Sequence, residues 1–162
     1  MARLHEYQGK ALLAQVGIPT PSGRVAATPD EARAAASEVG GPVVVKIQAW
    51  VTGRAGIGGV RFADTPDQAA ALAAGMLGMR AGGFQVDRVL VEQKLDIQRE
   101  FYAGIIVSDR ARAPVILFSS QTGVDVSPDA LTPEVFLPGR KGSLAVELIA
   151  ATRARDRLAY PI

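Results

Sequence analysis

The chain has 162 residues, of which 48% are hydrophobic and 21% are charged, and its formal net charge is +2. This length fits one ordinary domain or two small lobes, and the composition excludes collagen-like repeats and wholesale disorder. With no cysteine and a single histidine, His5, the sequence excludes disulfides, thiolate metal sites and histidine-cluster metal sites. The scattered positive charge does not call for nucleic acid or a membrane surface as a partner. Without a long apolar run or a signal-peptide core, we expect the cytoplasm as the compartment.

The first predicted element is a helix over residues 4–16, in which apolar residues recur at spacings of three and four before glycine and proline end it. A short extended piece is predicted at 22–27. Two further helices share one device for starting, a threonine cap followed by Pro-Asp and then by Glu or Gln. They begin at Thr28 and Thr65 and end near Gly40 and Gly78.

Short β-branched or apolar runs predict strands at residues 42–48, 60–62, 88–92, 100–107 and 115–119. The last two runs are expected to form a hairpin with its turn at 108–110, after which the pattern weakens until Ser143 opens a last helix. Because helices and strands alternate and then give way to a hairpin, the sequence predicts an α+β or α/β arrangement of lobes.

Lys46 is the first candidate functional residue. It lies in the predicted strand at 42–48, where alternation places Val45 and Ile47 on one face and Lys46 on the other. An ammonium group in so apolar a strand is costly unless it meets an anion. A lysine at a strand end can also extend its tip into water, and the strand alone leaves both interpretations equally open.

A glycine-rich loop follows at residues 53–59, with four glycines in seven positions. Glycines permit positive φ angles and close approach of a ligand, successive backbone amides can bind phosphate oxygens, and Arg54 adds a cation. The loop matches neither the P-loop nor the Rossmann motif, and by itself a flexible hairpin tip is the better explanation. Together with Lys46, a phosphate site becomes the favoured hypothesis.

A third cluster of polar residues runs from Glu92 to Glu100 and is a candidate linker between lobes. Carboxylates at strand ends can accept hydrogen bonds from ribose hydroxyls, and linker backbone groups can contact an adenine edge. A solvated charged connection is the simpler explanation for Lys94 and Arg99. It is less suitable for Glu92, which directly follows an apolar run.

These clusters, in this order, resemble the ATP-grasp domain of the succinyl-CoA synthetase (succinate–CoA ligase) β subunit family. The opening Leu4-His5-Glu6-Tyr7-Gln8-Gly9-Lys10 is similar to the family's usual start, Leu-His-Glu-Tyr-Gln-Ala-Lys. Further matching segments lie at residues 44–48, 53–60, 89–104 and 119–125, so the resemblance spans roughly residues 3 to 126.

The resemblance implies an ATP-grasp-like α+β fold, with a small α/β lobe and a partial second lobe of antiparallel strands. The expected divisions are an N-terminal helix and linker at 1–20, the small lobe at 21–95, and the partial second lobe with a C-terminal helix at 96–162.

The resemblance also implies a set of nucleotide-binding residues. Lys46 is expected to contact the phosphates of ATP or ADP, and the Gly53-Arg54-Ala55 turn to cover them. Glu92 and Leu95 are expected along the adenine linker, with Glu100 on the ribose. No catalytic residue and no metal ligand is assigned in this chain, because the family's Mg²⁺-binding Asn and Asp come later than residue 162.

The activity implied is that of an ADP-forming acid–CoA ligase, in which a phosphohistidine on an α subunit relays the phosphoryl group. The expected partners are an α-type CoA-binding subunit or the remainder of a CoA ligase, with homo-oligomer formation as a further expectation. ATP or ADP with Mg²⁺ is the expected cofactor, and residues 1–162 alone are expected to lack CoA-ligase activity.

The phosphate loop departs from the family pattern His-Ala/Val-Gly-Gly-Arg-Gly-Lys-Ala-Gly-Gly. Trp50 stands for the histidine, Gly56 for the lysine, and Thr52 and Ala55 for two glycines. These changes favour an alternative function, a non-catalytic ATP-grasp paralogue that serves as a binding or subunit-interaction module. Retention of Lys46 with the two carboxylates of the linker segment favours a nucleotide-binding part of a CoA ligase.

Overall fold

A computed structural model of the protein describes residues 3–108 and 113–119. The chain divides into two compact units, Met1–Asp96 and Ile97–Ile162. Among the residues described, no helix is both long and apolar enough to cross a membrane. The assignment of lobes to residues 1–20, 21–95 and 96–162 stays a prediction.

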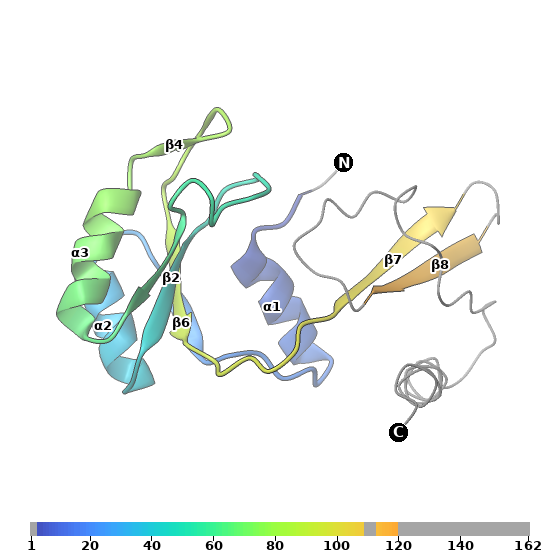
Figure 1. Cartoon of the computed structure of the whole chain (residues 1–162), viewed down its shortest axis with the longest axis horizontal. Helices are drawn as coiled ribbons and strands as arrows, with labels where there is room; N and C mark the ends of the chain where they lie inside the picture. The colour runs from blue at the N-terminus through green and yellow to red at the C-terminus, as the bar shows by residue number, and fades with distance from the viewer. Residues whose placement is uncertain (1–2, 109–112, 120–162) are drawn as a thin grey trace, which may run out of the picture. The chain divides into compact units, whose positions relative to one another are not determined.

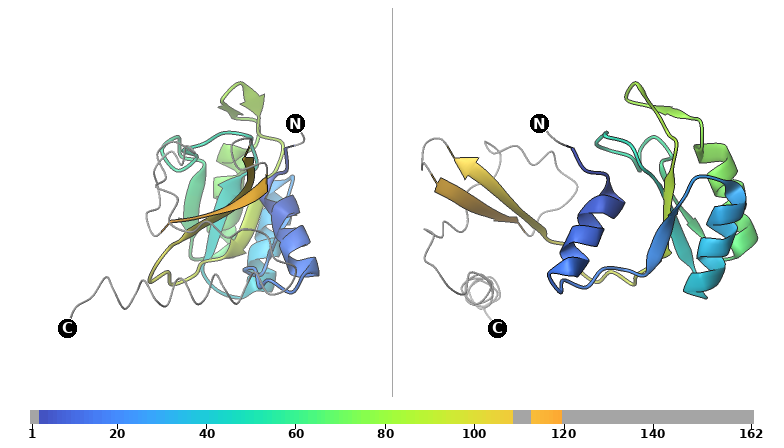
Figure 2. Two further views of the ribbon diagram at one scale, coloured as in Figure 1. Left: turned by 90° about the vertical axis from the view of Figure 1, so that its right-hand side faces the viewer. Right: turned by 180° about the vertical axis from the view of Figure 1, so that it is seen from behind.

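The first unit is built on a four-stranded antiparallel sheet with the strand order β1-β6-β2-β3. The strands are β1 (Gly23–Ala26), β6 (Val89–Gln93), β2 (Val43–Ile47) and β3 (Val60–Ala63). Helices α2 (Pro29–Val39) and α3 (Pro66–Met76) cover one face of this sheet. Helix α1 (Glu6–Gln15) lies on the opposite side, as Figures 1 and 2 show.

The other strands of the described residues form two hairpins, one in each unit. In the first unit, β4 (Arg80–Ala81) pairs with β5 (Phe84–Gln85) through a turn in which Gly82 and Gly83 have φ angles of 55° and 84°. Glycine reaches such angles without strain, which suits the two-residue turn. In the second unit, β7 (Tyr102–Ser108) pairs antiparallel with β8 (Ala113–Ser119).

Helices α2 and α3 begin as their sequences predict. The Thr28 hydroxyl accepts a hydrogen bond from the backbone N–H of Glu31 at 3.2 Å, and Thr65 accepts one from Gln68 at the same distance. The side chains of Glu31 and Gln68 reach back to a backbone N–H that precedes the cap. Gly40 ends α2 in the left-handed conformation, with φ 74°. These bonds satisfy N–H groups that a helix start leaves without a partner.

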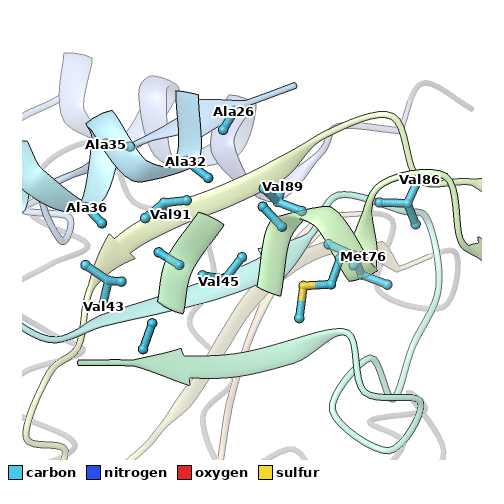
Figure 3. Close-up of a cluster of buried hydrophobic side chains, with 14 of the residues drawn as sticks. Ala26, Ala32, Ala35, Ala36, Val43, Val45, Met76, Val86, Val89 and Val91 are labelled. Carbon is cyan, nitrogen blue, oxygen red and sulfur yellow. The ribbon is translucent and has the colours of Figure 1, made fainter. Parts of the chain in front are cut away.

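The core lies between the sheet and the pair α2 and α3, and small side chains dominate it (Figure 3). The helices contribute Ala32, Ala35, Ala36, Ala69 and Ala73, and the sheet contributes Val43, Val45, Ile47, Val89 and Val91. Alanines on both helices let their backbones approach the sheet closely, so the buried side of β2 and β6 is filled without large residues.

The other face of the sheet is where the polar residues gather. In the register of β2 and β6, Val44 stands opposite Glu92, and Lys46 stands opposite Leu90. Since side chains alternate along a strand, these four residues point away from the alanine helices, and Lys46 and Glu92 are diagonal neighbours across the two strands. The sheet thus places an ammonium group and a carboxylate side by side under α1.

The structure confirms the predicted helices at 4–16 and from Thr28 and Thr65, and the predicted strands of both units, with small changes of boundary. The β4–β5 hairpin was not predicted. The expected turn at 108–110 lies mostly outside the described residues, and the expected helix from Ser143 lies wholly outside them.

A larger side chain should lower stability on the buried side of α3 and have little effect on its exposed side. Ala73 is completely buried, whereas Ala74, the next residue, is exposed. We expect Ala73→Leu to lower the free energy of unfolding by about 1 to 3 kcal/mol, because the core has no space for the added atoms, and Ala74→Leu to change it little. Urea unfolding of both variants measures the difference, and equal stabilities would contradict the packing described.

Candidate functional site

Lys46 projects from β2 into a cluster of charges between the sheet and α1. Its Nζ lies 3.1 Å from Oε1 of Glu6 and also forms an ion pair with Oε1 of Glu92. The Lys46 side chain is 21% exposed, and that of Glu92 is 3% exposed. The ammonium group therefore meets an anion, as an otherwise apolar strand requires.

Lys10 closes this cluster from the helix side. Its Nζ is 3.0 Å from Oε1 of Glu6, one turn earlier in α1, and forms an ion pair with Oε2 of Glu92. The four side chains Glu6, Lys10, Lys46 and Glu92 alternate in sign around a closed circuit, which we call the charge ring. Each member touches two partners of opposite charge, so the buried carboxylate of Glu92 is fully paired.

Arg54 joins the charge ring from the glycine-rich loop. Its Nη2 lies 2.7 Å from Oε2 of Glu6, and its Nη1 donates to the backbone oxygen of Ile47 at 2.9 Å. Oε1 of Glu6 therefore contacts Lys10 and Lys46, and Oε2 contacts the guanidinium group. Arg54 of the loop and Lys46 of β2 thus both contact the same carboxylate.

The glycine-rich loop is a compact turn that fixes the backbone beside Arg54. The N–H of Gly59 donates to the Arg54 oxygen at 2.7 Å, and the N–H of Gly56 donates to the Gly53 oxygen at 3.0 Å. A Cβ at Gly59 would lie 2.5 Å from Ile47 Cδ1, so glycine is required there by close approach. Gly53 has a positive φ of 66°. The loop therefore forms backbone hydrogen bonds of its own on both sides of Arg54.

Helix α1 is held to the sheet by polar and aromatic contacts. None of its residues is buried, and Leu12, Leu13 and Val16 are exposed. The N–H of Tyr7 faces the side-chain oxygen of Gln48 at 3.4 Å, and the His5 ring, just before the helix, stacks on Trp50 with centroids 4.5 Å apart. The position of α1 therefore depends mainly on the charge ring and on this stack.

Electrostatics strongly favour the ionised form of Glu6. Burial by itself raises the pKa of this carboxyl group, but the attraction of Lys46 and hydrogen bonds from Arg54 and Lys10 outweigh it and lower the pKa from 4.5 to about 2. Burial likewise acts to lower the pKa of Lys46, yet the bond to Glu92 and the charge of Glu6 raise it overall. Both groups are charged at neutral pH.

An open cavity of about 1030 Å³ adjoins the Arg54 side of the cluster. Its lining includes Glu6, Gln48, Trp50, Thr52 and Arg54. A cation at the wall of a cavity this large can meet a ligand without rearrangement of the sheet. The cavity is therefore the natural approach to the loop.

The structure brings together three of the residues selected from the sequence, Lys46, Arg54 and Glu92, with Gly53 and Ala55 in the turn that carries Arg54. Glu92 lies within β6 and not in a linker after it, and Leu95 follows β6 and is exposed. Glu100 belongs to the second unit.

Sequence reasoning missed Glu6 and Lys10 as members of the site. Their spacing of four residues is the usual one for a helical ion pair, which was the available signal. Spacing alone would have placed the pair on a solvated surface, because Lys46, the partner of Glu6, is 40 residues away and Glu92, the partner of Lys10, is 82 residues away.

The Mg²⁺ that the resemblance implies has no ligand set among residues 3–108 and 113–119. No group of three or more His, Asp or Glu side chains in those ranges is placed to hold a metal ion. The two carboxylates of the charge ring already face cations. The described residues therefore do not fit a magnesium site.

The ATP-grasp domain family matches residues 3–135 of the chain. The chain therefore belongs to the ATP-grasp family, which confirms the resemblance and the α+β fold class predicted from the sequence.

Within that family, the chain is similar to the β subunits of succinate–CoA ligases. It is 45% identical over 136 residues to the ADP-forming protein of Roseiflexus sp. (strain RS-1), covering 83% of this chain and 36% of that protein. It is 46% identical over 123 residues to the GDP-forming protein of Thermus thermophilus, covering 76% of this chain and 32% of that protein. The chain thus spans about a third of the length of these curated relatives.

Solved structures share the fold at lower identity. A dinucleotide-forming acetyl-coenzyme A synthetase of Ca. Korarchaeum cryptofilum matches with a TM-score of 0.63 and 22% identity, over 72% of this chain and 52% of that one. The ATP citrate lyase of Methanothrix soehngenii matches with a TM-score of 0.62 and 21% identity, over 93% of this chain and 43% of that one. These likenesses support the fold alone.

Acid should weaken the contribution of Glu6 to stability. Its pKa is about 2 in the folded protein and 4.5 in the unfolded reference, so the contribution is complete above pH 4.5 and is lost as the pH falls towards 2. The shift corresponds to roughly 3 kcal/mol. We expect the difference in unfolding free energy between the native protein and Glu6→Gln to shrink over this range in denaturant titrations.

That comparison separates Glu6 from the other charges around it, since Lys10, Lys46, Arg54 and Glu92 are the same in both proteins. A difference that stays constant from pH 5 to pH 2 would show that Glu6 is not held in its ionised form by the charge ring.

Proposed function

We propose that this chain is the nucleotide-binding part of an acid–CoA ligase β subunit, and that Lys46 and Arg54 bind the phosphates of ATP or ADP. One observation carries the proposal. Two cations from separate elements, β2 and the glycine-rich loop, converge on the carboxylate of Glu6, and Glu6 and Arg54 line an open cavity. Half-buried cations at such a point are suited to a polyanion.

The loop supplies a second kind of phosphate contact. Gly53 has a positive φ, and the N–H groups of Gly56 and Gly59 donate within the loop, so the backbone N–H groups proposed to meet phosphate are those of the turn at 53–55. Amides grouped in this way bind phosphate oxygens, and phosphoryl transfer needs positive charge around the oxygens that develop negative charge. In this proposal Lys46 and Arg54 position the phosphates, and the turn at 53–55 covers them.

The remaining contacts rest on the family resemblance. Leu95 and Glu92 are proposed along the adenine side of the nucleotide, and Glu100 is proposed on the ribose. Leu95 is exposed and accessible to a ligand, whereas Glu92 is buried, so its contact is proposed on the resemblance alone. The base preference is part of the proposal too: relatives include both ADP-forming and GDP-forming proteins, and we propose adenine.

The wider reaction needs more than these residues. We propose a partner chain, or further β-subunit residues, that bring the phosphohistidine, the CoA site and the Mg²⁺ ligands, in a cytoplasmic ligase of the tricarboxylic acid cycle. The proposal rests on the resemblance to succinate–CoA ligase β subunits, of which this chain spans about a third.

Removal of the Lys46 charge tests nucleotide binding. Lys46→Met keeps most of the side-chain length, so we expect ATP and ADP to bind at least about tenfold more weakly, as the loss of a charge-assisted contact predicts. Lys94→Met is the matched control, because Lys94 lies over the Phe62 ring and outside the charge ring. Isothermal titration with and without Mg²⁺ measures both, and equal affinities of native and Lys46→Met proteins would refute the assignment.

A second candidate function is a non-catalytic ATP-grasp module, and the loop sequence favours it. Gly56 stands where the family has a lysine, and Trp50 stands where it has a histidine. If these changes have weakened phosphate binding, Gly56→Lys combined with Ala55→Gly should restore it. Both positions are exposed, and a Cβ at Gly56 would meet the Gly53 oxygen at 3.5 Å, an ordinary contact.

We expect the double variant to bind ATP more tightly by about 1 to 3 kcal/mol, the range of a partly desolvated charged hydrogen bond. Calorimetry measures the gain, and circular dichroism checks that the fold is retained. An intact fold without any gain would show that the loop does not face a nucleotide.

A further inference from the structure

We propose that Glu6 is an internal competitor of nucleotide phosphate: its carboxylate holds Lys46 and Arg54 in the free protein, and a phosphate group must displace it to bind both cations. This inference rests on the proposed function. It assigns a role to a residue of α1 that neither the glycine-rich loop nor the strand sequence indicated.

The geometry of Glu6 resembles that of a bound phosphate. Its two oxygens lie on different cations, Oε1 at 3.1 Å from Lys46 Nζ and Oε2 at 2.7 Å from Arg54 Nη2. A phosphate group that bridged β2 and the loop would need these same two contacts. Charge-assisted bonds of this kind are among the strongest side-chain contacts. A phosphate group and the Glu6 carboxylate therefore compete for the same donors.

The donors available on Lys46 lead to the same conclusion. An ammonium group has three N–H bonds, and Glu6 and Glu92 each accept from Lys46. One N–H group remains for a ligand while both carboxylates stay in place. Departure of Glu6 would free a second N–H group of Lys46 and one edge of Arg54 together.

The charges add a further reason. Lys10, Lys46 and Arg54 face the carboxylates of Glu6 and Glu92, so the cluster has a net charge of +1. When Glu6 moves away, the net charge becomes +2 and a negative neighbour of the incoming phosphate is removed. Like charges at such distances repel, so a polyphosphate favours the state without Glu6.

Of the two carboxylates, Glu6 is the one able to leave. Glu92 is 3% exposed and lies in β6, between two hydrogen-bonded strands. Glu6 is 20% exposed and is the first residue of a helix that buries no residue. Moving Glu6 therefore costs polar contacts that phosphate can replace, whereas moving Glu92 would disrupt the sheet. The lysines would keep Glu92 as a partner.

If Glu6 had a positioning role instead, its removal would change phosphate affinity in the opposite direction. If Glu6 instead orients Lys46 and Arg54 for the ligand, its removal must weaken phosphate binding. Competition predicts that its removal strengthens binding. The direction of the change thus distinguishes a competitor from a positioning residue.

The experiment compares the native protein with Glu6→Gln, which keeps the size of the side chain and removes its charge. Inorganic pyrophosphate is the probe for the phosphate contacts, ATP is the probe for the proposed function, and adenosine is the control without phosphate. Glu38→Gln is the matched variant, since Glu38 is exposed on α2 and pairs with Arg24 away from the site.

We expect Glu6→Gln to bind pyrophosphate and ATP about five- to tenfold more tightly than the native protein, the size expected for the loss of one competing charged contact. Adenosine affinity should not change, and Glu38→Gln should bind all three ligands as the native protein does. Equal or weaker pyrophosphate binding by Glu6→Gln would overturn the competition, even where the native protein binds ATP. Failure of both proteins to bind either phosphate ligand would refute the proposed function together with this inference.

A variant that keeps the charge covers the case in which Glu6→Gln does not fold. In Glu6→Asp the side chain is one methylene shorter, so its carboxylate reaches less far towards Lys46 and Arg54. We expect its pyrophosphate affinity to exceed that of the native protein as well, by a smaller factor. Native affinity in a folded Glu6→Asp protein would contradict the proposal.

Discussion

The burial of the Glu92 carboxylate is the constraint on which the site depends. The side chain of Glu92 is 3% exposed inside β6, and a carboxylate buried there without partners would cost several kcal/mol. The cations that satisfy it are Lys46, supplied by the neighbouring strand, and Lys10, supplied by α1. Lys10 carries Glu6 with it on the same face of the helix, and Glu6 in turn binds Arg54 of the loop. One buried charge thus links the sheet, the first helix and the glycine-rich loop.

The sequence allowed prediction of those parts of the structure that depend on local signals. Each of these signals can be recognised from a few neighbouring residues: the threonine caps of α2 and α3, the alternation in β2, and the glycines around Arg54. The partners of Lys46 could not be predicted in this way, because Glu6 and Glu92 are 40 and 46 residues distant and meet Lys46 only through the docking of α1 and the pairing of β2 with β6. The predicted strand at 88–92 already ended on Glu92, but the polar run from Glu92 to Glu100 was also a candidate linker, and the structure places Glu92 within β6.

The three helices of the first unit pack on the sheet in two different ways. Helices α2 and α3 are joined to it by alanines and valines, an apolar contact that salt and pH leave largely unchanged. Helix α1 is joined to it by charges and one aromatic stack, and its leucines are exposed. Ion pairs weaken with ionic strength and with protonation, so the two sides of the same sheet differ in their response to solution conditions. The candidate site lies on the responsive side.

Trp50 lies where three segments of this responsive side meet. Its indole ring stacks on His5 of the N-terminal segment and touches Phe84 of the β4–β5 hairpin edge-on, with centroids 5.5 Å apart, while its backbone leads into the glycine-rich loop. It is 41% exposed and is the sole tryptophan of the chain. Indole fluorescence depends on the polarity and the neighbours of the ring. The protein therefore carries an intrinsic optical label at the junction of helix, hairpin and loop, and its emission can be followed without attaching any dye.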